Sequence, residues 1–268
     1  MNIVLECPDD MRRLREISEL AVKVGARFRR PMTQTELQKH IFKTYFMLRV
    51  GLGALGFLFP LLLVLIGLWE KISIQGSMSD YYFATASPEL RDFPDRVLFV
   101  GILFTLGCFL ILYRGFNRTE DWMLNIAGVS ALAIALFPER APSNCNNCGS
   151  ALIPYVHETA GVVLFVCTAF VAWRCSDATL RYLPDSQKRF FKWLYNGFAG
   201  VMFVTPFGVI AMTSIFGVSD WKILIVEWIV IWVFATYWLV KTVELKMDDS
   251  EIEKTLARLA KGNASSPA

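Results

Sequence analysis

The chain has 268 residues, of which 54% are hydrophobic and only 19% charged, and its mean hydropathy is +0.43. An ordinary soluble domain is roughly 45–50% apolar and about 25% charged. The formal net charge of +3 is too small to indicate a polyanionic partner. The composition excludes a soluble enzyme, a nucleic-acid-binding domain and a disordered regulator, and it predicts a multi-pass membrane protein.

The chain begins with a basic arm over residues 1–43. Apolar residues recur at helical spacing over residues 9–29 and basic residues cover much of the remaining surface, which predicts an amphipathic helix. Such a helix can lie on an anionic membrane surface, where each basic residue contributes about 1 kcal/mol. The alternative is that these charges only set the topology of the first span. The capping-box spacing of Thr33 and Glu36 predicts a second helix that runs into the membrane.

Six apolar blocks follow, and each approaches the roughly 20 residues that a helix needs to cross a bilayer. Inside lipid every backbone polar group must be bonded within its own segment, and none of the blocks alternates as a barrel strand would. The sequence therefore predicts an all-α membrane domain over residues 44–241. The six predicted spans are approximately 45–69, 97–113, 122–137, 161–173, 197–216 and 223–240.

Two further patterns accompany the spans. Aromatic residues that predict contact with the headgroup layer stand near most span ends: Trp69, Tyr113, Trp122, Trp173, Tyr195, Trp221 and Trp238. Glycines that predict close approach between helices lie in the first and fifth spans: Gly51, Gly53, Gly56, Gly197 and Gly200.

The distribution of basic residues predicts the orientation. With six spans, 22 of the 27 Lys and Arg residues fall on the side of the N-terminus. Both termini are therefore expected in the cytoplasm and the protein in the cell membrane. The tail, residues 242–268, carries a second capping box at Ser250 and Glu253, which predicts a short amphipathic helix followed by a frayed end.

The first outer loop, residues 70–96, is dense in serine, aspartate and tyrosine. One interpretation is a solvated surface whose arginines pair with neighbouring carboxylates. The other is a lid that presents hydroxyl groups and a carboxylate to a lipid headgroup. The candidate ligand-binding residues in this loop are Ser79, Asp80, Tyr81, Tyr82 and Glu89.

The second outer loop, residues 138–160, contains a C-x-x-C pair, Cys145 and Cys148. This pair predicts a disulfide in an oxidising compartment, with free thiols or a zinc half-site as alternatives. No second C-x-x-C exists to complete the roughly four ligands that structural zinc takes, and no metal or cofactor is predicted.

His157 and Glu158 open the fourth span, and Glu227 is the single acid well inside an apolar block. An ionised side chain at mid-membrane costs roughly 2.5–3.5 kcal/mol, so such residues usually face a cavity or a partner. A histidine that meets Asp80 and Glu227 would form a general-base or metal arrangement. The alternative for His157 is an ordinary hydrogen-bond network at a helix end.

Two short segments carry a family resemblance. The string Met78-Ser79-Asp80 followed by Pro88-Glu89, and the segment from Val156 to Phe165, resemble the signatures of the DRAM-like proteins. That family has six spans, and its wider group includes a factor that remodels GPI-anchor lipids and modulators of phosphoinositide-kinase recruitment. The resemblance implies lipid-related work at a membrane, with these matched positions: Ser79, Asp80, Glu89, His157 and Glu158.

These features are compatible with three functions. The first is a protein that binds a lipid or lipid-like ligand in an outward-facing polar cavity and modulates lipid metabolism. The second is a lipid hydrolase or transferase that uses Asp80 and His157, and the third is a small-solute transporter. The expected partners are membrane lipids and a second copy or another membrane protein, and no nucleic acid is expected.

Overall fold

The computed structural model describes most of the chain, in these ranges: residues 33–84, 94–137, 155–180, 183–215, 217 and 221–264, with Glu16 and Glu19. It contains two units, Met1–Thr44 and Tyr45–Ala268. Three of the sequence predictions lie outside the described residues: the amphipathic helix over 9–29 apart from Glu16 and Glu19, the site residue Glu89, and the pair Cys145 and Cys148.

Helix α2, Gln34–Trp69, begins at the predicted capping box. The backbone N–H of Thr33 donates to Glu36 Oε2 over 2.8 Å, and the N–H of Glu36 donates to Thr33 Oγ1 over 3.3 Å. These reciprocal bonds satisfy donors that a helix N-terminus leaves without partners, and they confirm the predicted start. The bond from the Thr33 N–H holds the pKa of the Glu36 carboxyl below its ordinary value.

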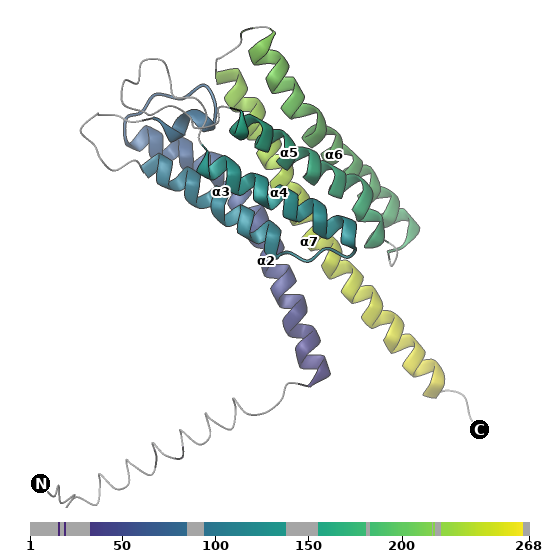
Figure 1. Cartoon of the computed structure of the whole chain (residues 1–268). Coiled ribbons are helices and arrows are strands. Elements are labelled where there is room, and N and C mark those ends of the chain that lie inside the picture. The colour runs from purple at the N-terminus through teal and green to yellow at the C-terminus, as the bar shows by residue number, and fades with distance from the viewer. Residues whose placement is uncertain are drawn as a thin grey trace, which may run out of the picture. The chain divides into compact units, whose positions relative to one another are not determined.

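All regular secondary structure in the described ranges is helical, which confirms the all-α prediction. Figure 1 shows the long helices after α2: α3 Pro94–Leu112, α4 Arg118–Leu136, α5 Val156–Phe170, α6 Asp185–Ser214 and α7 Trp221–Ala264. Short 3-10 and π turns occur in between: η1 Ser79–Tyr82, η2 Val171–Cys175 and η3 Ser176–Ala178.

Within the larger unit, the helices pack in chain order, with α3 on α4, α4 on α5, α5 on α6 and α6 on α7. Helix α2 completes the bundle because it contacts both α3 and α7. A Cβ at Gly51 would lie 2.6 Å from Phe109 of α3, and one at Gly56 would lie 2.9 Å from Ala235 of α7.

The predicted role of the first-span glycines is confirmed at Gly51, Gly53 and Gly56, where an added Cβ would fall within 3 Å of a neighbour. The prediction is wrong for Gly197 and Gly200, around which no described atom lies within 4 Å of such a Cβ. Both sit in α6, whose apolar stretch has a much smaller buried share than those of the other four helices that qualify as spans.

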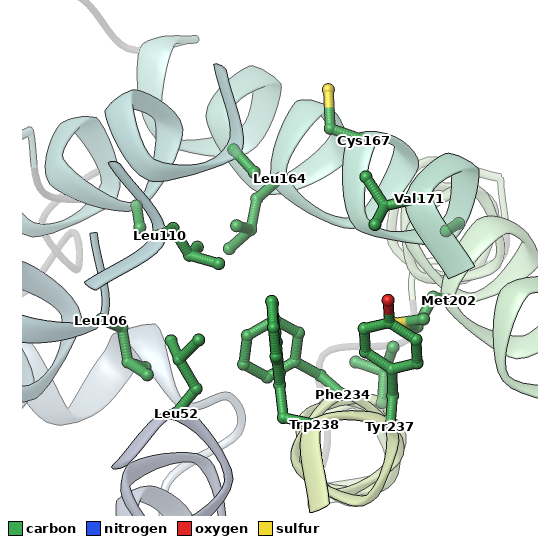
Figure 2. Packing of buried hydrophobic residues seen from close by; sticks show 14 of the residues in the cluster. Leu52, Leu106, Leu110, Leu164, Cys167, Val171, Met202, Phe234, Tyr237 and Trp238 are labelled. Carbon is green, nitrogen blue, oxygen red and sulfur yellow. The ribbon is translucent and has the colours of Figure 1, made fainter. Parts of the chain in front are cut away.

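The core is aliphatic and aromatic, and Figure 2 shows side chains from α2, α3, α5 and α7 converging on its centre, with Leu52, Leu110, Leu164 and Trp238 among them. Three aromatic residues predicted at the headgroup layer are instead fully buried: Tyr113, Tyr195 and Trp238. Tyr113 packs edge-on against Trp238, and the ring of Tyr195 lies beside the Nζ of Lys241, one of the charged residues described below.

Five helical stretches are long and apolar enough to cross a membrane: His40–Trp69, Pro94–Leu112, Val156–Cys175, Asp185–Ser214 and Trp221–Glu244. Six had been predicted. Helix α4 is not among the five, because its first turn carries Arg118, Glu120 and Asp121.

The predicted tail helix is not a separate element. Helix α7 has 44 residues and is about 66 Å long at 1.5 Å per residue, more than twice the thickness of a bilayer core of about 30 Å. Ser250 lies inside it, so the second predicted capping box does not begin a helix.

Candidate functional site

The predicted lipid-facing loop is fixed by its own polar groups. The N–H of Ser77 donates to Asp80 Oδ2 over 3.0 Å, and the N–H of Asp80 donates to Ser77 Oγ over 3.1 Å. This reciprocal pair has the geometry of a capping box and starts η1. The Asp80 carboxylate therefore holds the turn that presents Ser79.

Helix α7 holds the same loop. The N–H of Met78 donates to Glu227 Oε2 over 2.7 Å, and the N–H of Leu224 donates to the carbonyl oxygen of Gly76 over 2.9 Å. A bond between a backbone N–H and a carboxylate is among the stronger hydrogen bonds in proteins. Glu227 thus binds the loop backbone directly.

Ser79 and His157 are in direct contact. Ser79 Oγ lies 3.0 Å from His157 Nε2, and His157 Nδ1 lies 2.9 Å from the carbonyl oxygen of Phe137. A carbonyl oxygen only accepts, so Nδ1 carries the proton in this bond and the neutral ring has its lone pair on Nε2. The Ser79 hydroxyl therefore donates to Nε2, and its oxygen keeps lone pairs for another donor.

The imidazole is held rigidly. The side chain of His157 is only 8% exposed, and its ring stacks on Phe99 of α3 with a centroid distance of 6.4 Å and an interplanar angle of 16°. His157 is the second residue of α5, and Phe137 follows the end of α4. Three helices thus position one side chain.

The two tyrosines of η1 have different surroundings. Tyr81 is buried against Gly67 of α2, and burial raises the pKa of its hydroxyl, with the nearby Asp95 carboxylate acting in the same direction. The Tyr82 carbonyl accepts a 2.9 Å bond from Arg96 Nε, and the guanidinium lies 4.6 Å from the Tyr82 ring centroid. Both tyrosines therefore anchor η1 to neighbouring helices.

The predicted constellation forms in part. Among the described contacts, His157 meets Ser79, whereas the carboxylates of Asp80 and Glu227 bond to loop backbone. Glu158 is exposed in the first turn of α5. The described residues contain no group of three or more His, Cys, Asp or Glu side chains that could hold a metal ion.

A second polar cluster, at the opposite ends of the helices, was missed by sequence reasoning. Arg49 of α2 is 1% exposed, and its Nε and Nη2 donate to the Tyr113 hydroxyl over 2.9 and 2.5 Å. Its Nη1 donates to the carbonyl oxygen of Lys241 over 2.7 Å. In the sequence, Arg49 is one of the 22 basic residues counted on the side of the N-terminus, and nothing in that count indicates a buried side chain.

The same cluster contains a buried ion pair in α7. Lys241 Nζ lies 3.2 Å from Glu244 Oε2 and also donates to Thr179, and the Tyr195 hydroxyl donates to the same Glu244 oxygen. Both charged side chains are almost fully buried. The sequence could have predicted this ion pair, because a lysine and a glutamate three residues apart at the end of an apolar run lie on the same face of a helix.

Asp95 was also missed, because the sequence assigned it to a solvated loop. It lies in the first turn of α3 and is 0% exposed. Neither carboxylate oxygen has a hydrogen-bond partner in the described part of the chain.

A scan against protein-family models found no match, and searches of the curated proteins and of the solved structures found none either. Function is therefore inferred from the contacts of the chain's own residues.

Proposed function

We propose that the chain is a six-span protein of the cell membrane with both termini in the cytoplasm. Helix α4 packs between α3 and α5, and its 19 residues are about 28 Å long, close to the bilayer core of about 30 Å. Its acids face the preceding turn, because Glu120 accepts from the N–H of Phe116 over 2.9 Å and Asp121 accepts from Gly115 over 2.6 Å.

In this topology η1 lies on the outer side, opposite most of the basic residues. The test is single-cysteine labelling with a membrane-impermeant maleimide in intact cells, on a background without the six native cysteines. We expect labelling at position 73 and none at position 118. The opposite result, or equal labelling of both, would contradict this orientation.

For the η1 end, we propose binding of the polar headgroup of a membrane lipid, with the protein acting as a modulator of lipid metabolism. The Ser79–His157 contact carries this proposal. The pair lies where α5 begins, at the expected level of the headgroups, and His157 is held by Phe137 and Phe99. Ser79 Oγ donates to the ring and can accept from a headgroup hydroxyl or ammonium.

The resemblance to DRAM-like proteins at Ser79, Asp80, His157 and Glu158 supports the same role. In this proposal Asp80 and Glu227 hold η1 in position, while Ser79 makes the contact with the ligand. The favoured ligands are lipids whose headgroups carry hydrogen-bond donors, such as ethanolamine, serine, inositol or sugar.

The experiment is mass spectrometry of lipids that co-purify with the full chain after incubation with a mixed lipid extract. Wild type is compared with Ser79→Ala and His157→Ala. The control is Thr159→Ala, which changes an exposed residue two positions along the same helix. A lipid class retained by wild type and the control but lost from both site variants supports the proposal. Equal lipid profiles in all four proteins would overturn it.

The second candidate is a lipid hydrolase or transferase, favoured by the 3.0 Å distance between Ser79 Oγ and His157 Nε2. A serine whose hydroxyl donates to an oriented imidazole is an arrangement used for nucleophilic catalysis. Ser79 would attack the ester or amide carbonyl while Nε2 accepts its proton, and Nε2 would return that proton to the leaving alcohol or amine as the C–O or C–N bond breaks. Water or an acceptor alcohol would then release the acyl group from Ser79, and the Phe137 carbonyl would orient the ring. In the sequence hypothesis Asp80 took part, but here it bonds to Ser77.

A fluorophosphonate probe distinguishes the two candidates, because it labels only a nucleophilic serine. Labelling of wild type that disappears in Ser79→Ala and falls in His157→Ala, together with a lipid product from wild type alone, would favour the enzyme. Unlabelled wild type that retains an unchanged lipid would favour binding.

A further inference from the structure

The carboxyl group of Asp95 is buried without a hydrogen-bond partner among the described residues. Both of its oxygens are inaccessible and accept no hydrogen bond from any described residue. In the described part of the chain, one other buried acid, Glu244, has an orphaned oxygen, and its second oxygen pairs with Lys241 and Tyr195. Neither oxygen of Asp95 has a comparable partner there.

The groups around Asp95 add negative charge. Glu70, in the turn that follows α2, contributes a carboxylate that acts on Asp95 as a like charge. The last turn of α2 contains no basic residue, and its carbonyl groups form the negative end of the helix. Tyr81 faces the site from η1, and the guanidinium of Arg96, next to it on α3, lies over the Tyr82 ring.

The last turn of α2 lies close to this carboxyl group, at a position occupied by glycine. A Cβ at Gly67 would lie 3.6 Å from Asp95 Oδ2 and 2.9 Å from Tyr81 Cε1, so glycine leaves this face of the helix open. Lys71 ends the helix with a φ of 60°, which a residue with a side chain rarely adopts, and the N–H of Ile72 returns to the Gly67 carbonyl over 2.8 Å.

An isolated ionised carboxylate is very unfavourable in a low-dielectric interior. Acids placed this way in membrane helices mark proton or ion sites, and the carbonyl end of a helix is a recurring ligand for Na⁺ and H⁺ in membrane proteins. We propose that Asp95 is the centre of a binding site for one small monovalent cation, H⁺ or Na⁺, between the last turn of α2 and the first turn of α3.

The site adjoins η1, since a Cβ at Gly67 would lie close to both Tyr81 Cε1 and Asp95 Oδ2. A bound cation would compensate the Asp95 carboxylate of α3 and the carbonyl end of α2, next to Tyr81 of η1. This inference does not depend on headgroup binding, because it uses none of the contacts of Ser79 or His157.

The test measures the thermal unfolding of the purified full chain in NaCl and in choline chloride at equal ionic strength. For Na⁺, we expect a rise in Tm of about 2–4 °C in wild type, as for a saturating ligand of moderate affinity. Asp95→Asn is a neutral isostere and should lose this dependence. Glu70→Gln should require more sodium for the same rise. The control is Asp185→Asn, which changes an exposed aspartate in the first turn of α6.

Infrared spectroscopy tests whether the bound cation is H⁺. A carbonyl band of a protonated carboxylic acid that is present in wild type and absent from Asp95→Asn, without a sodium effect, identifies the proton as the cation. Absence of both the sodium effect and this band in wild type would overturn the proposal, because the N-terminus of α3 would then hold an ionised Asp95 by itself. If Asp95→Asn does not fold, the absence of both signals from wild type still overturns the proposal, and the weaker sodium response of Glu70→Gln still tests the place of the site.

Discussion

Arg49 and Tyr113 join α2 to the end of α3 through two hydrogen bonds to one hydroxyl, at 2.9 and 2.5 Å. A third bond, from Arg49 Nη1 to the Lys241 carbonyl, extends the connection to α7. A guanidinium provides this forked geometry, and the ammonium of lysine does not. Arg49 is therefore a structural centre at this end of the bundle.

We predict that Arg49→Ala lowers the free energy of unfolding by about 3–5 kcal/mol, because it leaves the buried Tyr113 hydroxyl and Lys241 carbonyl without their donor. Arg49→Lys should restore only part of this loss. Denaturant unfolding in detergent measures both variants, with Lys188→Ala, an exposed basic residue of α6, as the control. A loss for Arg49→Ala no larger than that of the control would contradict the prediction.

The stability effects of substituting Lys241 and Glu244 should depend on each other, because the two buried charges form an ion pair. Each single substitution, Lys241→Met or Glu244→Leu, leaves one buried charge without its partner and should lower stability by about 3–5 kcal/mol. The double variant removes both charges and should be more stable than the sum of the two single losses implies. A double-mutant cycle of unfolding free energies measures the difference, and strict additivity would show that the pair is not coupled.

Helices α3 and α4 approach through two glycines. A Cβ at Gly107 would lie 2.8 Å from the Gly128 carbonyl oxygen, and a Cβ at Gly128 would lie 2.7 Å from that of Gly107. Because backbone atoms cannot move aside cheaply, we expect Gly128→Ala to lower stability by about 1–3 kcal/mol. Gly101→Ala in α3 is the matched control, since no described atom lies within 4 Å of its added Cβ. Equal Tm values for both variants would be the contrary result.

The sequence was sufficient for the features that depend on local pattern. Helix type, the Thr33–Glu36 start and the close approach at Gly51 follow from hydropathy and spacing, and the structure contains all three. The sequence suggested Asp80 and Glu227 as partners of His157, whereas the structure brings Ser79 to it from a position 78 residues away.

Features that depend on the environment of a side chain were not predictable in the same way. Tyr113 and Tyr195 stand near span ends, where tyrosine usually lies at the headgroup layer. Each is instead buried with a charged partner from another helix, Arg49 for Tyr113 and Glu244 for Tyr195. Asp95 follows a loop rich in charge, and its burial depends on how η1 folds over α2. A hydropathy pattern predicts neither the partner of a polar side chain nor the loop that covers it.

Glu227 of α7 holds the η1 loop by accepting a hydrogen bond from the N–H of Met78. Glu227→Ala removes the acceptor of a charge-assisted bond and should lower stability by about 1.5–3 kcal/mol. The loop between α2 and η1 should also become more sensitive to limited proteolysis from the outer side. Because this loop presents Ser79, the variant should lose the lipid that His157→Ala loses. Glu158→Ala, an exposed acid in the first turn of α5, is the control for charge at the same end. Unchanged proteolysis and lipid retention in Glu227→Ala would show that the loop keeps its position without α7.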